Sequence, residues 1–309
     1  FPYSAHLFGL YLKRVMPELP WVCDFRDEWK NNPYHLDSFS RRLKLKLEKK
    51  KEHEVTSECN YFITNTPLML EGFLADNQKL KDKSTFIPNG YDEDDFAEVT
   101  DERDGGDRFV ITYTGSLYGR RNLDEFLEGF KLASDRGDID PKRVAIRIVG
   151  NIYEKAITAY SEKYGLEGII SSYGYMPHKE SIQMLFNSDA ILLVIGKGKG
   201  SRNFYTGKIF EYIRANRPIL AIVPEDGVAA DVIRETGTGI VVDPDDNIGT
   251  ADAIAKLYKS WEEGEMLHNP DWDNIKKYSR ETQTMKLSEI FTIAINKSSR
   301  GESNNETKI

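Results

Sequence analysis

Short apolar segments alternate with amphipathic segments along most of this chain. The apolar segments are residues 21–25, 61–64, 85–87, 109–113, 144–149, 169–173, 190–195, 219–223 and 239–242. Between most of them, apolar residues recur every three or four positions, which is the period of a helix with one buried face. Apolar strands that alternate with such helices are typical of parallel sheets covered by helices. The pattern therefore predicts an α/β fold built on parallel sheets.

A polar, acidic segment separates two sets of these elements. Residues 96–107 contain a Gly-Gly pair near their end and have the composition of a linker. We expect a partial α/β lobe over residues 1–95 and a complete α/β lobe over residues 108–272. A last helical region, residues 273–295, is followed by a polar tail, residues 296–309, that is expected to be disordered.

Composition narrows the class of protein. The 309 residues are 39% hydrophobic and 30% charged, which is typical of globular proteins, and the length suits two domains. A formal net charge of -8 argues against a general nucleic-acid-binding protein. Cys23 and Cys59 are the two cysteines, and we expect reduced, buried thiols of a cytoplasmic protein. No apolar run approaches the roughly 18 residues that span a bilayer.

The most informative segment is NFYTGKIFEYIRANRPILAIV, residues 203–223. It predicts a polar loop, a helix that begins near Thr206 and Gly207, and a buried strand. Free N–H groups at the helix start, together with Lys208, suit a phosphate. Glu211 follows three residues later on the same helical face, where a carboxylate can accept hydrogen bonds from both ribose hydroxyls. The alternative is a solvated lysine beside a surface carboxylate.

A second turn, YTGSLYGRRN at residues 113–122, follows the first strand of the second set. Ligands of parallel sheets bind beyond the carboxyl ends of the strands, so this turn is expected to face a ligand. Gly115 lets the backbone approach a diphosphate, and Arg120 or Arg121 can neutralise its charge. A tight turn with solvated arginines is the alternative. The loop GKGKGSR, residues 196–202, lacks P-loop spacing and is interpreted as a mobile cationic loop.

Seven segments carry a resemblance to a known family. They are PWVCDFRDEW, FIPNGYDEDDF, YTGSLYGRRNLDEFLEGF, RIVG, GYMPHKESIQMLFNSDAILL, GKIFEYIRANRPILAI and ETGTGIVVDPDD. In this order they resemble the retaining glycosyltransferases of family 4, also called group 1, which have the GT-B fold. The resemblance implies two Rossmann-like lobes, the first for the acceptor and the second for a nucleotide-diphospho-sugar. It also implies that the helix over residues 273–295 crosses back to the first lobe.

The resemblance assigns roles to individual residues. The residues expected to bind the donor are Gly115, Ser116, Arg120, Arg121, Tyr175, Met176, Thr206, Gly207, Lys208 and Glu211. The first four line the diphosphate turn, and Tyr175 and Met176 flank the base. Lys208 binds phosphate and Glu211 holds the ribose, while Asn89-Gly90 marks the crossing between lobes.

Two features depart from the family pattern. Many members have a glutamate seven residues before the position of Glu211, where this chain has Phe204. The first lobe, residues 1–95, is also shorter than is usual in the family. Because Phe1 lies inside an apolar-periodic segment, we expect the chain to be the remainder of a longer protein.

The segment after the first predicted strand is expected to supply the acceptor side. Asp27 can orient or deprotonate an acceptor hydroxyl, while Arg26 and Lys208 can stabilise the leaving diphosphate. The alternative is an ion pair of Arg26 with Asp24 or Asp27 that fixes the loop. The resemblance suggests front-face transfer without a protein nucleophile. We expect no cofactor and no metal, and interpret His178 as a helix-start residue.

Residues 41–51 are rich in cations. They form the face of a predicted helix, with Leu43 and Leu47 packing inward. This face is either solvated or bound to anionic lipid at the inner face of a membrane, which suits a lipid-linked acceptor. Salt-sensitive cosedimentation with anionic vesicles distinguishes the two.

The leading hypothesis is a cytoplasmic glycosyltransferase of the hexosyltransferase type. It moves a sugar from a nucleotide donor to a saccharide or lipid-linked acceptor, in cell-surface polysaccharide or glycoconjugate synthesis. A sugar-nucleotide epimerase of GT-B shape and a non-catalytic nucleotide-sugar-binding subunit are the alternatives. The sequence leaves the sugar, the base and the acceptor open.

Overall fold

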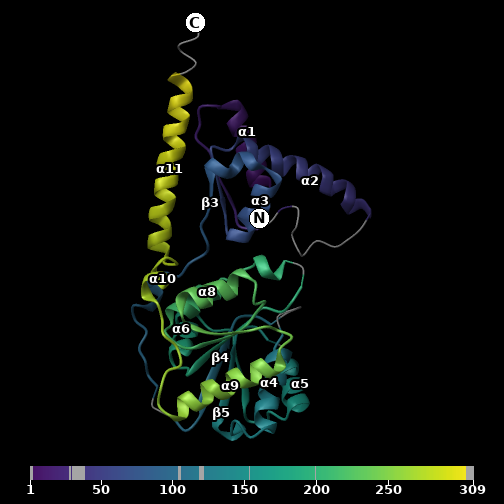
Figure 1. The fold of residues 1–309 in the computed structure, drawn as a ribbon, viewed down its shortest axis with the longest axis vertical. Helices are drawn as coiled ribbons and strands as arrows, with labels where there is room; N and C mark the ends of the chain where they lie inside the picture. Colours follow the sequence, from purple (N-terminus) through teal and green to yellow (C-terminus); the bar gives the residue numbers. More distant parts are fainter. Residues whose placement is uncertain are drawn as a thin grey trace. The chain divides into compact units, whose positions relative to one another are not determined.

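The computed structural model describes residues 3–27, 29, 39–103, 106–117, 122–152, 154–198 and 200–303. Two compact units divide the chain. One comprises residues 1–89 and 281–309, and the other comprises residues 90–280. Each unit contains one sheet (Figure 1), and every strand pairing in both sheets is parallel. The predicted α/β class with parallel sheets is therefore confirmed.

The first unit is built on a three-stranded sheet of order β1(Val22–Phe25)-β2(Tyr61–Thr64)-β3(Ser84–Phe86). Its helices are α1(Ser4–Val15), α2(Phe39–Glu58), α3(Pro67–Asp76), the 3-10 helix η1(Gln78–Lys83) and α11(Arg280–Ser303), of which all but the first residue belong to this unit. Phe25, Phe62 and Phe73 meet edge to face in its core, with ring centroids 4.8–5.5 Å apart. Ile290 of α11 packs on Ile63 and Ile87, so the last helix covers this sheet.

The second unit contains a six-stranded sheet of order β6-β5-β4-β7-β8-β9. The strands are β4(Phe109–Thr114), β5(Val144–Val149), β6(Ile170–Gly174), β7(Ala190–Val194), β8(Ile219–Ile222) and β9(Gly239–Val242). This is the strand order of a Rossmann fold, in which the direction of the order reverses between β4 and β7. All five residues of β7 are buried because helices cover both faces of the sheet.

Seven α-helices of the described residues belong to this second unit. They are α4(Asp124–Asp135), α5(Glu154–Tyr164), α6(His178–Phe186), α7(Lys208–Arg214), α8(Val228–Thr236), α9(Asn247–Glu262) and α10(Trp272–Lys276), with 3-10 helices η2(Glu93–Phe96), η3(Pro141–Arg143) and η4(Ser201–Asn203). Helices α4, α5 and α9 lie on one side of the sheet, and α6 and α8 lie on the other (Figure 1). None of the helices within the described part of the chain is long and apolar enough to cross a membrane.

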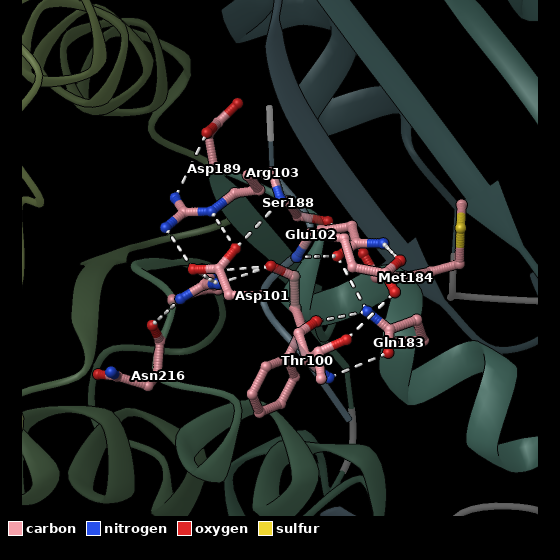
Figure 2. A network of polar contacts seen from close by, with 12 residues as sticks. Thr100, Asp101, Glu102, Arg103, Gln183, Met184, Ser188, Asp189 and Asn216 are labelled. Atoms are coloured by element: carbon pink, nitrogen blue, oxygen red, sulfur yellow. Dashed lines mark hydrogen bonds and ion pairs between the residues drawn. The ribbon is translucent and has the colours of Figure 1, made fainter. Parts of the chain in front are cut away.

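The segment expected to be a linker lies inside the second unit, which begins at residue 90. Figure 2 shows how Gln183 of α6 contacts Thr100 of this segment, and Asn187, directly after α6, contacts Glu102. Gln183 accepts a hydrogen bond from Thr100 N at 3.3 Å and donates to Thr100 O at 2.6 Å, and Asn187 accepts from Glu102 N at 3.2 Å. Gln183 and Asn187 are about one helical turn apart, and one turn is nearly as long as two residues of extended chain. Their side-chain amides can therefore bond to alternate residues of the segment, Thr100 and Glu102.

Two other expectations about boundaries also differ from the structure. The final helical region is divided into α10 and α11, and α11 continues to Ser303 through residues that were expected to be disordered. A polar composition does not prevent a helix from propagating, because each added residue forms one further backbone hydrogen bond. Residues 304–309 lie outside the described residues.

Leu47 of α2, which was expected to pack inward, is 64% exposed.

A buried arginine closes the contact between residues 100–103 and the second sheet. Arg217 is 3% exposed, donates to Phe186 O at 2.7 and 2.9 Å, and lies 2.7 Å from Asp101 Oδ2. Arg103 donates to both carboxylate oxygens of Asp101 at 2.9 and 2.8 Å, which holds the pKa of Asp101 down at about 2. The buried guanidinium of Arg217 needs the Phe186 carbonyl and the Asp101 carboxylate as partners, because the cost of removing its charge from water is otherwise uncompensated.

Asp101 should make the free energy of unfolding depend on pH in the acidic range. Its folded pKa of about 2 is below the ordinary value of 3.8, so its stabilising effect is present above pH 4 and is lost as the pH falls toward 2. We expect Asp101→Asn to lower the urea midpoint at pH 6 and to have progressively less effect between pH 4 and pH 2. Asp135→Asn, which removes an exposed pair with Lys131, is the matched control and should change little. A deficit of Asp101→Asn that stays constant down to pH 2 would contradict this account.

Candidate functional site

The candidate site lies at the carboxyl edge of the second sheet, where β4 and β7 diverge. Gly115 directly follows β4, and the chain after β7 leads through a loop into α7. In sheets of this topology, ligands bind beyond the carboxyl ends of the strands at the point where the strand order reverses. The turn after β4 and the start of α7 are therefore the expected ligand contacts.

Three glycines with positive φ end neighbouring strands at this edge. Gly115 has φ 114°, Gly150 has φ 136° and Gly174 has φ 67°. Gly115 N donates to Val149 O and Gly150 N donates to Gly174 O, both at 2.7 Å. A Cβ on Gly150 would lie 2.5 Å from Gly115 O, so this backbone contact excludes a side chain. The three strand ends thus form a bare backbone edge that a ligand can approach closely.

Of these glycines, only Gly115 was predicted as a site residue from the sequence. Gly150 was missed, although it stands directly after the apolar strand β5, which was the available signal, and Gly174, the last residue of β6, was not among the predicted site residues. Ser116, also predicted, is half-buried, and its carbonyl oxygen accepts a hydrogen bond from Tyr113 Oη at 3.4 Å. Arg120 and Arg121 lie outside the described residues.

Lys208 brings its charge to the same turn. Its Nζ donates to Thr114 O at 2.9 Å and lies 3.5 Å from the centroid of the Tyr113 ring, a cation–π contact. The ammonium is 3.6 Å from the position that a Cβ on Gly115 would take. The structure therefore brings together Lys208 and Gly115, which are far apart in the sequence.

Tyr212, which lies on α7 as Lys208 does, fixes the carboxyl end of β4. The buried phenol accepts a hydrogen bond from Thr114 N at 2.9 Å and donates to Thr114 O at 3.2 Å. Burial raises its pKa, so the hydroxyl keeps its proton and remains a donor. The sequence analysis did not identify Tyr212, although its position directly after Glu211 on the apolar side of α7 was a signal.

Glu211 lies one turn beyond Lys208 on α7, and its side chain is 28% exposed. Its Oε1 is 2.9 Å from His178 Nε2, and His178 Nδ1 is 3.7 Å from Asp95 Oδ1. His178 is the first residue of α6, as predicted, but its ring also contacts a predicted site residue. That contact could not be predicted from local sequence.

Thr206 and Gly207 immediately precede α7. Thr206 is 4% exposed, and its hydroxyl has no hydrogen-bond partner among the described residues. Gly207 is exposed and already has helical φ and ψ. Because α7 has seven residues, the charge at this end comes mainly from Lys208 and less from aligned peptide dipoles.

The remaining predicted residues lie at two other places. Tyr175 and Met176 follow Gly174 at the end of β6, and Tyr175 is 79% exposed while Met176 is half-buried. Arg26 and Asp27 follow β1 in the first unit. Arg26 Nη2 is 2.6 Å from Asp24 Oδ2 and its Nη1 donates to Ile87 O at 2.9 Å, so the alternative Asp24–Arg26 ion pair is present.

Asp27 is exposed beside that pair. Burial raises the pKa of Asp24, whereas the charge of Arg26 acts to lower it. Within the described ranges, no three His, Cys, Asp or Glu side chains gather in a way that would hold a metal ion.

Comparisons with solved structures address the fold. The structure of Anabaena HepE in complex with UDP has a TM-score of 0.71 at 14% identity, covering 94% of this chain and 76% of HepE; HepE was also crystallised with UDP and glucose. Sucrose-phosphate synthase of Thermosynechococcus elongatus has a TM-score of 0.63 at 16% identity, covering 93% of this chain and 71% of that chain. These neighbours have the GT-B fold, and the predicted GT-B class is confirmed.

Comparisons of sequence address the family. Mannosylfructose-phosphate synthase of Agrobacterium fabrum is 22% identical over 206 residues, which are 62% of this chain and 42% of that protein. The chain therefore spans less than half of this curated relative. Residues 94–277, more than half of the chain, match the family model of glycosyl transferases group 1. With this match across the whole candidate site, the chain belongs to the group 1 glycosyl transferases.

Proposed function

We propose that this glycosyltransferase moves a sugar from a nucleotide-diphospho-sugar to a saccharide or lipid-linked acceptor with retention of anomeric configuration. Synthesis of cell-surface polysaccharide or glycoconjugate is the proposed setting. The observation that carries the proposal is the position of the Lys208 ammonium, 3.6 Å from where a Cβ on Gly115 would lie. A diphosphate there would meet a full positive charge and a backbone edge without side chains.

The order of groups along α7 supports the same donor. Lys208 begins the helix beside the glycine turn, and Glu211 lies one turn further on. A nucleotide has its diphosphate and its ribose in that order, so phosphate would contact Lys208 while the ribose hydroxyls would donate to Glu211. Tyr175 and Met176 would then contact the base. Because HepE was crystallised with UDP, a uridine nucleotide is the first donor to test.

The proposed chemistry requires stabilisation of a leaving diphosphate. The bond from the anomeric carbon to the diphosphate oxygen breaks, and the acceptor oxygen bonds to the same face of the sugar. The acceptor proton passes to the leaving phosphate, so no protein nucleophile is required. Lys208 would stabilise the charge that develops on the diphosphate. Asp27 would orient the acceptor hydroxyl, and Arg26, held by Asp24, would add positive charge on the acceptor side.

A non-catalytic nucleotide-sugar-binding subunit is the second candidate, and Phe204 is the observation that favours it. This half-buried side chain stands seven residues before Glu211 and brings no charge to the hydroxyls of a donor sugar. A panel of UDP-, GDP-, ADP- and dTDP-sugars with acceptors separates the candidates. Glycosyl transfer supports the transferase, binding without turnover supports the subunit, and isomerisation of the donor indicates an epimerase.

Two carboxylate variants should affect donor binding differently. Glu211→Ala removes the acceptor for the ribose hydroxyls and should weaken UDP binding by about 1–3 kcal/mol, measured by calorimetry. Asp27→Ala should leave UDP affinity unchanged, because its proposed partner is the acceptor. Glu162→Ala on α5 is a matched control for removal of a carboxylate elsewhere in the second unit. If Glu211→Ala and Asp27→Ala weaken UDP binding equally, the division of roles between them is wrong.

A further inference from the structure

We propose that His178 is a positioning residue that orients Glu211 for recognition of the ribose, a role that depends on the function proposed above. The imidazole lies between two carboxylates. Its Nε2 is 2.9 Å from Glu211 Oε1, and its Nδ1 is 3.7 Å from Asp95 Oδ1. Histidine suits such a position because its two ring nitrogens point in divergent directions and can each donate when the ring is protonated.

Three elements of the second unit supply this arrangement. Asp95 belongs to η2, His178 begins α6 and Glu211 belongs to α7. Two ion pairs also link α7 to η2 and α6 to the residues just after η2. Arg214, one turn beyond Glu211, contacts Glu93 of η2 at 2.8 Å, and Lys179, beside His178, contacts Glu98 at 2.9 Å. These contacts between the same segments do not involve the His178 ring.

The contact leaves Glu211 able to bind a second partner. An ionised carboxylate has about four lone-pair sites on its two oxygens, so it can accept from His178 through Oε1 and from two hydroxyls as well. The Glu211 side chain is 28% exposed and would otherwise sample several rotamers. Holding it in one rotamer before the nucleotide arrives reduces the conformational entropy lost on binding. The expected consequence is higher affinity for ligands that carry ribose hydroxyls.

This role predicts a loss that depends on the ribose. His178→Ala should weaken binding of UDP by about five- to tenfold, comparable to the loss of one typical hydrogen bond, because His178 acts on the ligand only through Glu211. It should change the affinity for 2′,3′-dideoxy-UDP less than twofold, because that ligand has no hydroxyl to meet Glu211. His178→Gln, whose amide nitrogen can occupy the place of Nε2, should restore UDP affinity to within about threefold of wild type.

The experiment is calorimetric titration of the full chain with both nucleotides. The variants are His178→Ala, His178→Gln, Glu211→Ala and the double variant His178→Ala/Glu211→Ala, with Lys208→Met as a reference that should weaken both ligands. In the Glu211→Ala background, His178→Ala should cause no further loss, because the two residues then act through one contact. Unchanged melting temperatures show that the exposed His178 variants remain folded.

Specific outcomes would overturn the inference. Equal loss of UDP and 2′,3′-dideoxy-UDP in His178→Ala would indicate a general structural role, and unchanged affinity for both would remove any role in binding. In either case, a loss of both ligands in Lys208→Met would leave the proposed function standing. If wild-type protein binds none of UDP, GDP, ADP and dTDP, both the proposed function and this inference are wrong.

Discussion

Replacing Lys208 with methionine should reduce affinity for UDP by about 10- to 100-fold, because a charge-assisted bond to phosphate contributes about 1.5–3 kcal/mol. The rate of sugar transfer should fall further, by about 100- to 1000-fold, since the charge on the leaving diphosphate grows in the transition state. Methionine keeps a similar length and apolar stem, so the helix should still pack on Tyr113. Calorimetry with UDP and single-turnover transfer assays measure the two effects.

The control for this variant is Lys131→Met on α4, where the lysine is 51% exposed and pairs with Asp135. It removes the same charge from the same unit without touching the carboxyl edge of the sheet. Both variants should melt within a few degrees of wild type, because neither removes buried apolar surface. Affinity of Lys208→Met within twofold of Lys131→Met would rule out Lys208 as the phosphate-binding cation.

Replacing Gly150 with alanine should destabilise the second unit more than any other single substitution considered for this edge. A residue other than glycine at φ 136° is strained, and the added Cβ would meet Gly115 O at 2.5 Å. The obstacle is backbone, so it cannot move aside as a flexible side chain would. We expect a loss of at least about 2 kcal/mol and a melting temperature lower by about 4–8 °C, measured by calorimetry.

Gly137→Ala is the matched control for this prediction. Gly137 also has a positive φ, 75°, but a Cβ there would meet nothing within 4 Å. Gly137→Ala should lower the free energy of unfolding only through backbone strain, by about 1 kcal/mol. Gly150→Ala should in addition weaken UDP binding, because the clash displaces Gly115 from Lys208. Equal destabilisation by the two variants would show that the contact between Gly150 and Gly115 is not close in solution.

The agreement between sequence and structure is best where burial is strongest. The apolar segment 144–149 coincides with β5, and the segment 109–113 is extended by one residue in β4. A strand buried on both faces of a parallel sheet must be almost wholly apolar, so its pattern is visible without any knowledge of its neighbours. The same reasoning fails for residues 96–107, whose polar composition does not reveal that Gln183 and Asn187 bind the backbone there.

The residues of the candidate site also divide into those that the sequence could identify and those that it could not. Gly115, Lys208 and Glu211 could be identified from the sequence, because each has a local pattern and a chemical property that suits a nucleotide. Their partners could not. Tyr212 reaches Thr114 across 98 residues, and His178 reaches Glu211 across 33 residues, and no local signal specifies either pairing.

The sequence by itself determined the α/β class and the parallel sheets, and it supplied the residue types of the candidate site, because strand burial and turn chemistry are set by neighbouring residues. Only the tertiary structure decided that the Lys208 ammonium lies against the glycine turn, that three glycines form one bare backbone edge and that His178 contacts Glu211. The physical reason is distance along the chain. Contacts between remote residues depend on how the strands are ordered and how the helices pack on them, and the order β6-β5-β4-β7-β8-β9 is a property of the folded sheet.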